Sequence, residues 1–449
     1  MDFNTFKQYV IETAAEMGIG EYELYYSTFE GTDVGTFKHE INEFSSSVDG
    51  GVCFRCLVDG KMGYASTEAL TPEEAKGIVS RALENARTIE SEEEQFLVAG
   101  GQTYQKVADR SYPLPDTSEL VGTALELDAA LYAADPLIID GSQGGAGISA
   151  GRIAIYNSKG LDVSCESSAS YYIAAAVVSK DGEMSDSYEM KLGSFEDKDI
   201  AATVKKAVDD AKAMLGAGVA PTGSYPVVFS PRAMSSVLAV FSSAFSSESA
   251  QKGLSRYAGK EGEKIAADIV TLTDDPFYKD SAMPRSFDGE GSPTYTKNVV
   301  ENGVLKTLLY NLKTAAVAGV KTTGNASKAG YDSPIGIRPF TFYLAPGDIT
   351  EEELIRRAGN GVYITQLGGL HAGANAVSGD FSLQSSGFMI EDGRKTDKAV
   401  KSFTVAGNFF DMLKQITALS DTVEKPRSSG STAFCSPSVL VEGLSIAGK

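Results

Sequence analysis

Histidine is the commonest metal ligand and a frequent general base, yet it occurs only twice in these 449 residues, at His39 and His371. A catalytic zinc site takes three protein ligands and a structural site four. No second histidine follows His39 at helical spacing, so we interpret it as a polar residue on an exposed strand. His371 lies in the glycine-rich segment 368–375, where backbone can approach a ligand closely. With no acid or nucleophile beside it, we favour a structural loop residue over a general base.

The four cysteines, at positions 53, 56, 165 and 435, include one short motif, Cys53-Phe54-Arg55-Cys56. A redox pair needs its thiols at the start of a helix, where the dipole lowers a thiol pKa. This motif lies in a predicted strand, on which side chains three residues apart face opposite ways. We therefore expect structural cysteines. Four are too few for a disulfide framework, which favours a reducing compartment.

Four carboxylates lie close together in Asp274-Asp275 and Asp288-Gly289-Glu290. Paired carboxylates can bind a hard cation or share a proton, but aspartate beside proline or glycine is also typical of turns, which we favour. The glycine-rich run 141–147 could suggest a phosphate loop. No helix-forming segment follows it, so we interpret it as a hairpin turn.

The elements expected to position such chemistry lie between Tyr225 and Pro276. Residues 226–229 form an apolar run that predicts a buried strand. Ser230 and Pro231 then provide an N-cap and a first helical residue. In the helix that follows, apolar residues recur at helical spacing on one face and serines lie on the other. The apolar residues are Val237, Leu238, Phe241 and Phe245; the serines are Ser235, Ser236, Ser242, Ser243 and Ser246.

From this segment onward the chain resembles the TldD/PmbA family, the metalloprotease-like proteins first described as modulators of DNA gyrase. Short blocks in family order carry the resemblance: 251–266, 273–276, 287–291, 303–306, 323–326, 379–382, 386–388 and 406–408. In the catalytic TldD branch the resemblance implies a His-Glu-x-x-x-His motif on this helix. Counting back from Lys252-Gly253, the corresponding hexapeptide is Leu238–Ser243, which holds no usual zinc ligand.

The chain therefore resembles the PmbA (TldE) branch, whose members lack the motif and partner a TldD protein. The resemblance implies no catalytic residue, metal or cofactor in this chain, and unfolded peptide as substrate. It also implies a heterodimer with a TldD-like subunit, or self-association as a homodimer. The carboxylate blocks recur in both branches, which implies a scaffold or groove role for them and not the bond-breaking step.

The segment 379–390 alternates small and bulky residues, like an edge or groove-lining strand. Such a strand can pair with the backbone of an extended peptide. The pattern alone favours an ordinary core strand, and the family resemblance makes a peptide groove an equal alternative. The candidate peptide-groove residues are His371, Asn375, Gly379, Asp380, Phe381, Ser382, Ser386, Gly387 and Phe388.

The pattern along the whole chain predicts an α+β fold with antiparallel strand meanders and packed helices. We expect a strand-helix unit in residues 1–90, a linker in 91–116, a second unit in 117–220 and a larger strand-rich domain in 221–449. The first unit should contain strands at 22–27, 34–44, 51–59 and 62–66, interrupted at Gly31 and at 49–51. Asp59-Gly60 and Asp181-Gly182 occupy matching places, which indicates an internal duplication.

A net charge of -20 argues against binding to nucleic acid. No apolar stretch is long enough to span a membrane, so we expect a cytoplasmic protein. Two alternatives to the PmbA-like subunit stay open. One is a self-sufficient hydrolase using His371 and the 274–290 carboxylates, and the other is a non-enzymatic homo-oligomeric binding protein.

Overall fold

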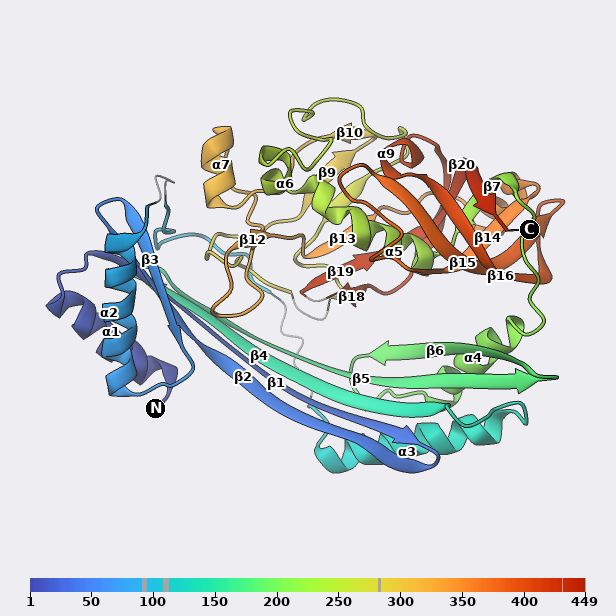
Figure 1. Cartoon of the computed structure of the whole chain (residues 1–449), viewed down its shortest axis with the longest axis horizontal. Helices are drawn as coiled ribbons and strands as arrows, with labels where there is room; N and C mark the ends of the chain where they lie inside the picture. The colour runs from blue at the N-terminus through green and yellow to red at the C-terminus, as the bar shows by residue number, and fades with distance from the viewer. Residues whose placement is uncertain (91–94, 108–112, 282–283, 430, 449) are drawn as a thin grey trace.

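The protein has two halves that lie against each other (Figure 1). The computed structural model describes residues 1–90, 95–107, 113–281, 284–429 and 431–448. One long antiparallel sheet with four helices forms the N-terminal half, and two further sheets form the C-terminal half. The fold is α+β, as predicted.

The N-terminal sheet has the strand order β3-β2-β1-β4-β5-β6, and every pairing in it is antiparallel. Its strands are β1 (Glu21–Phe37), β2 (Glu40–Val58), β3 (Lys61–Thr67), β4 (Gln143–Asn157), β5 (Asp162–Lys180) and β6 (Glu183–Leu192). Helices α1 (Phe3–Glu16) and α2 (Pro72–Thr88) pack on one end of this sheet, and α3 (Thr117–Ala134) and α4 (Ile200–Ala213) pack on the other. A helix, three strands and a helix thus occur twice, and β1 and β4 join the copies. This arrangement agrees with the expected duplication.

The two hairpin turns that suggested the duplication adopt the same conformation. Asp59 and Gly60 have φ of 51° and 77°, and Asp181 and Gly182 have φ of 53° and 85°. Positive φ at both central residues is the type I′ pattern, whose twist matches that of the flanking strands.

Two interruptions expected in the N-terminal strands, at Gly31 and at 49–51, are wrong. Gly31 lies within β1 and pairs with Ser47 on one side and Ser149 on the other. Gly50 lies within β2, where a Cβ would be 2.6 Å from the Ser27 carbonyl oxygen. Glycine inside a strand can mark close approach of another backbone instead of a turn. The real turn falls at Lys38 and His39, which both have positive φ, so His39 does not lie on a strand.

The run 141–147 is also not a hairpin turn as a whole, because β4 begins at Gln143. A Cβ on Gly144 would lie 2.3 Å from the Ala124 carbonyl oxygen in α3. The glycine therefore allows the helix to pack directly on the strand.

The C-terminal half contains two six-stranded sheets and a small two-stranded one. The first has the order β10-β9-β8-β13-β19-β18, with strands β8 (Leu272–Asp274), β9 (Lys297–Glu301), β10 (Val304–Leu305), β13 (Thr341–Leu344), β18 (Arg427–Ser429) and β19 (Thr432–Cys435). The second has the order β16-β15-β14-β7-β20-β17, with strands β7 (Gly223–Phe229), β14 (Gly361–Gly368), β15 (Asp380–Glu391), β16 (Arg394–Asn408), β17 (Ile416–Val423) and β20 (Pro437–Ala447). The small sheet pairs β11 (Ala326–Ser327) with β12 (Gly336–Ile337).

The second sheet closes on itself because β16 also pairs with β20. Helix α5 (Pro231–Phe241) packs between the two large sheets, against β7, β14 and β20 on one side and β13 and β19 on the other. Short helical segments complete the domain: η1 (Ser242–Phe245), α6 (Ser247–Gln251), α7 (Leu312–Ala318), α8 (Glu351–Ala358) and α9 (Phe409–Met412). Among the described residues, no helix is both long and apolar enough to cross a bilayer.

The two halves meet at a small apolar core and a few polar contacts. Tyr25 and Phe287, one from each half, belong to the same buried cluster. Tyr104 donates its hydroxyl to the Gly291 carbonyl at 2.8 Å. A Cβ on Gly291 would lie 2.5 Å from Leu161 Cδ2, so only glycine permits this close approach.

Candidate functional site

Helix α5 begins as the sequence predicts. The strand β7 precedes it, Ser230 Oγ accepts the Ala233 amide at 3.2 Å, and Pro231 occupies the first turn. Val237, Leu238 and Phe241 are at most 1% exposed, because they face the core between the two large sheets.

The hexapeptide 238–243 does not lie on one continuous helix. Helix α5 ends at Phe241, and the chain continues as the 3₁₀ turn η1. The predicted outward serine face is also only partly correct, because Ser235 and Ser246 are buried. Ser235 tolerates burial because its hydroxyl donates to the Pro231 carbonyl at 2.7 Å within the helix.

An aromatic cluster fills the space around the hexapeptide. Phe241 stacks on Phe409 with ring centroids 4.5 Å apart and an interplanar angle of 7°. Phe381 from β15 meets Phe241 edge-on at 6.3 Å. All three rings are at most 4% exposed. The position that would carry metal ligands in the catalytic branch is therefore packed with hydrocarbon.

A catalytic zinc ion does not fit these residues. Leu238, Ala239 and Phe241 offer no side-chain donor atoms, and Ser242 Oγ already donates to the Ala239 carbonyl at 3.1 Å. Within the described ranges, no group of three or more His, Cys, Asp or Glu residues is arranged to hold a metal ion.

The candidate groove strand β15 is not an edge strand, so that interpretation of 379–390 is wrong. It pairs with β14 on one side and β16 on the other. Beyond the end of β14, the loop before β15 forms the backbone hydrogen bond instead, since Ser382 donates its amide to the Gly373 carbonyl at 2.7 Å. A peptide therefore cannot add to the backbone of this strand.

The side chains of β15 alternate between the core and the surface. Phe381 points into the core, and a Cβ on Gly387 would lie 1.9 Å from the Tyr363 carbonyl oxygen. Asp380 and Ser382 are exposed, whereas Ser386 and Phe388 are half-buried. Only the outward set can meet a ligand.

The loop before β15 is held by its own polar contacts. Asn375 Oδ1 accepts the amides of Val377 and Ser378, at 2.9 and 3.1 Å. Asp380 accepts from Asn408 Nδ2 at 2.8 Å, and this hydrogen bond is the main cause that lowers the Asp380 pKa. Gly379 has φ of 82° and packs against the Phe410 ring.

The two histidines differ in their surroundings. His371 is exposed and makes no hydrogen bond or ion pair with any other described residue. No contact joins it to the 274–290 carboxylates in the described chain. His39 lies 2.9 Å from the buried Asp128 of α3, which also accepts from Thr36 at 2.8 Å.

The predicted structural role of the Cys53/Cys56 pair fits its position. The side chains face opposite sides of β2, and Cys56 packs beneath α2 whereas Cys53 joins the core between the halves. Burial raises the pKa of both thiols, that of Cys56 to about 11. Neither resembles an activated thiolate.

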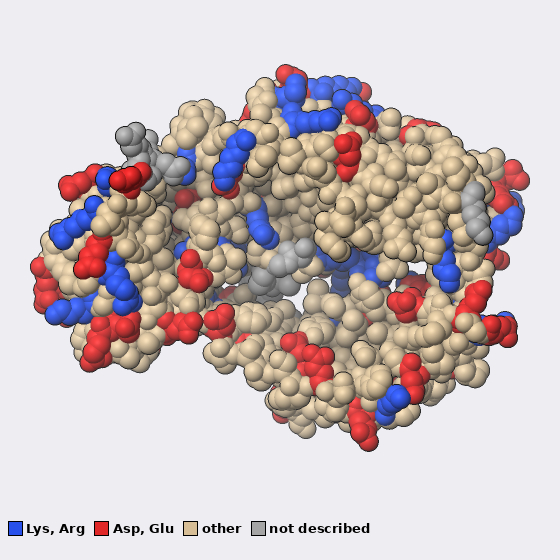
Figure 2. Space-filling model, in the orientation of Figure 1, with Lys and Arg blue, Asp and Glu red and all other residues tan. Residues whose placement is uncertain are grey.

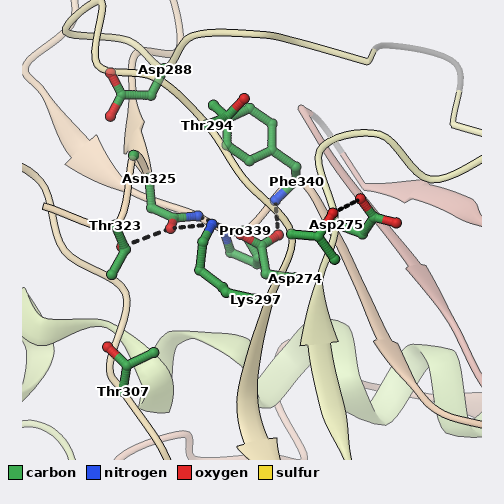
Figure 3. A network of polar contacts seen from close by, with 12 residues as sticks. Asp274, Asp275, Asp288, Thr294, Lys297, Thr307, Thr323, Asn325, Pro339 and Phe340 are labelled. Carbon is green, nitrogen blue, oxygen red and sulfur yellow. Dashed lines mark hydrogen bonds and ion pairs between the residues drawn. The ribbon is translucent and has the colours of Figure 1, made fainter. Parts of the chain in front are cut away.

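Asp274 anchors a buried polar network in the C-terminal half (Figure 3). Its carboxylate accepts from Lys297 Nζ at 3.0 Å, Asn325 Nδ2 at 2.7 Å and the Phe340 amide at 2.7 Å. Asp274 is 0% exposed and the Lys297 side chain 5%. Every donor is supplied by the protein, so this aspartate serves the fold. The neighbouring Asp275 accepts the Phe277 amide at 2.9 Å, an Asx turn.

Asp288 and Glu290 form a second buried pair. Asp288 Oδ1 accepts the amides of Glu290 and Ser292, both at 2.9 Å, which is the predicted turn chemistry. Glu290 accepts the Leu312 amide at 2.9 Å. Burial raises the pKa of both carboxyls, and the nearby Asp288 charge adds to the effect at Glu290, whose pKa rises to about 8.

Glu290 also lines a cavity of about 480 Å³ between the two halves, which we call the junction cavity. Arg55 from β2 and Lys328 from the C-terminal half contribute to the same wall. Arg55 pairs with the buried Glu23 at 2.7 Å. The spacing of these residues does not predict the cavity. The one signal of this cavity in the sequence was a charged residue, Arg55, inside the otherwise apolar strand 51–58.

A larger cleft of about 1110 Å³ separates the N-terminal sheet from the C-terminal half, and a hollow is visible there in Figure 2. Strands β4 and β5 form one wall, and segments 279–281 and 425–426 contribute to the other.

Comparison with known proteins identifies the lineage of this fold. Three domain models match in order: PmbA/TldA metallopeptidase domain 1 over residues 22–86, the central domain over 110–215 and the C-terminal domain over 222–448. A metalloprotease PmbA homolog from Haemophilus influenzae is 25% identical over 453 residues, covering 98% of this chain and 95% of that protein.

Solved structures show the same architecture. A protein from Thermotoga maritima, described as a candidate modulator of a DNA gyrase, is 30% identical with a TM-score of 0.89, covering 99% of this chain and 100% of that one. TldE from Thermococcus kodakarensis has a TM-score of 0.82 at 24% identity, covering 98% and 100%, and shows the shared fold.

The duplicated strand-helix units, the closed sheet around α5 and these matches define a metallopeptidase-like class of protein. The chain belongs to the PmbA/TldD metallopeptidase family.

Proposed function

We propose that this chain is a PmbA/TldE-like subunit that binds unfolded peptide and a TldD-like catalytic partner, and that it has no catalytic metal of its own. The observation that carries the proposal is the packing of residues 238–243. Phe241 and its aromatic neighbours occupy the space, and the hexapeptide itself contains no histidine, cysteine, aspartate or glutamate.

The large cleft between the halves supports a role in holding peptide. Its volume of about 1110 Å³ exceeds that of a typical small-molecule site, so an extended segment of several residues could occupy it. The outward face of β15 and the His371 loop stay candidate contacts through the exposed side chains of Asp380, Ser382, Asn375 and His371. Only their side chains would contact the peptide, since the β15 backbone is already paired with neighbouring strands.

A peptidase assay tests the proposal. The purified chain is incubated with an unstructured peptide and zinc, alone and together with a TldD-like subunit. We expect cleavage only in the mixture, and we expect chelator to abolish it. Zinc-dependent cleavage by the chain alone would contradict the proposal.

A variant at His371 tests the alternative that the chain is a self-sufficient hydrolase. His371→Ala should leave cleavage by the mixture within about twofold of the parent, because His371 has no acid partner in the described chain. Complete loss of turnover with intact assembly would favour a general base on that loop. Size-exclusion chromatography of the mixture checks assembly, and a chain that remains a homodimer beside the partner would contradict the heterodimer.

A further inference from the structure

The junction cavity is a second hollow between the halves, distinct from the cleft. Strands β2 and β3 supply Arg55, Lys61 and Tyr64 to its wall, and the C-terminal half supplies Glu290, Lys328 and Asp332. At about 480 Å³ it falls in the range of small-ligand sites. Ile89 and Phe96 add apolar surface to the same wall.

Lys328 is a half-buried cation of this wall. Its ammonium lies 4.4 Å from the centre of the Tyr25 ring, and burial lowers its pKa. It forms no ion pair with a carboxylate of the described residues. A half-buried ammonium without a carboxylate partner is costly unless an anion joins it.

Arg55 lies behind the same cavity, but Glu23 already balances its charge. Asp332 and Glu290 are the acidic groups of the wall. Glu290 is 4% exposed, and burial raises its pKa to about 8. At neutral pH its carboxyl is therefore protonated and can donate a hydrogen bond instead of repelling an anion. Lys61 and Lys313 line the same wall. The cavity therefore combines several cations, among them the half-buried Lys328, with one neutral carboxyl donor and apolar surface.

We propose that the junction cavity binds a small organic carboxylate, such as the free C-terminal carboxylate of a short peptide, with Lys328 as its ion-pair partner and Glu290 as a hydrogen-bond donor. The peptide as source rests on the proposed function, whereas the carboxylate chemistry does not. The apolar wall formed by Ile89 and Phe96 suits an organic group better than inorganic phosphate.

Calorimetric titration of the full chain tests the proposal with three probes: N-acetyl-alanyl-leucine as the free acid, the same dipeptide as its C-terminal amide, and inorganic phosphate. We expect the free acid to bind at least about tenfold more tightly than the amide or phosphate, because a charge-assisted contact is worth at least that much. Equal affinity for acid and amide, absence of binding, or preference for phosphate would overturn the proposal.

A matched pair of variants locates the site. Lys328→Met should weaken free-acid binding at least about tenfold, since it removes the charge but keeps the length. Lys398→Met, on an exposed lysine paired with Glu391 in the C-terminal half, should leave it unchanged. An unaltered affinity for Lys328→Met, with circular dichroism confirming the fold, would move the site elsewhere. These outcomes do not depend on the peptidase assay.

The pH dependence tests the role of Glu290. The charged groups around it are Asp288 on its own loop, Arg55, Glu23 and Lys61 from the N-terminal sheet, and Lys313, Lys328 and Asp332 from the C-terminal half. Affinity for the free acid should fall as pH rises through about 8. Glu290→Gln, which keeps a donor, should flatten that fall. A fall of equal size in the variant would remove Glu290 from the site.

Discussion

Phe241 occupies the centre of three packed rings at the position where the catalytic branch is expected to carry ligands. The apolar side chains at 237, 238 and 241 could be assigned to a buried helix face from their spacing alone. Their partners Phe381 and Phe409 could not, because those rings come from segments about 140 to 170 residues further along the chain.

Phe241→Ala should lower the free energy of unfolding by about 3–5 kcal/mol, because a buried ring is lost and a cavity remains. Urea denaturation followed by circular dichroism measures the change. Phe29→Ala serves as the control. Phe29 is 50% exposed on β1, so its replacement should lower the free energy of unfolding far less. Equal losses for the two variants would contradict the packing described for Phe241.

Asp274→Ala should destabilise the C-terminal half by about 3–5 kcal/mol, because it leaves the Lys297 ammonium buried without its partner. Thermal unfolding checks this, with Asp280→Ala on the exposed surface as the control. If Asp274 were instead a metal ligand held for function, its loss would change stability little.

Polar residues could be read from the sequence only where the partner is near in the chain. The Ser230 cap and the Asp275 and Asp288 turns follow local rules. The Arg55–Glu23 pair depends on the register of β1 against β2, which brings together residues 32 apart.

At the scale of elements, alternation along a strand predicts which side chains share a face but not which strands lie beside it. That is why 379–390 could be recognised as a strand and wrongly considered an edge. Its place between β14 and β16 follows from sheet order. Glycine-rich stretches were mistaken for turns for a related reason, since Gly50 and Gly144 allow close contacts with elements distant in the sequence.

The contact between α3 and β4 gives a matched prediction on two glycines. Gly144→Ala should destabilise the protein by about 1–3 kcal/mol, because its Cβ would press on the Ala124 carbonyl oxygen. Gly122→Ala should stabilise it by up to about 1 kcal/mol, because that position in α3 is open and alanine favours the helix. Melting temperatures of both variants decide the point, and destabilisation by Gly122→Ala would contradict this orientation of α3 on the sheet.

At the scale of the whole molecule, the cavities lie where the two halves face each other. Neither could be predicted from the sequence, because each half supplies only one wall. Domain borders near 91–116 and 220 stay predictions. Residues 91–94 and 108–112 of the expected linker lie outside the described residues.

Stability should depend on pH through Glu290, which is buried at this junction. Its folded-state pKa lies above the unfolded value, so the folded protein holds the proton more tightly. The resulting stabilisation is complete below about pH 4 and is lost as pH rises through about 8. As the pH rises from about 5 to about 9, the parent loses this stabilisation and Glu290→Gln does not. The variant should therefore become more stable relative to the parent over this range. Thermal unfolding of both proteins at the two pH values measures the change. A stability difference between variant and parent that is the same at both pH values would contradict the raised pKa.

The central proposal is that this family member holds no catalytic metal at residues 238–243. Elemental analysis of untagged protein, purified without chelator and dialysed against zinc, tests it most directly. We expect far less than one zinc per chain, and no change when Phe241 is replaced by Ala. One tightly bound zinc per chain, located beside α5, would contradict the account.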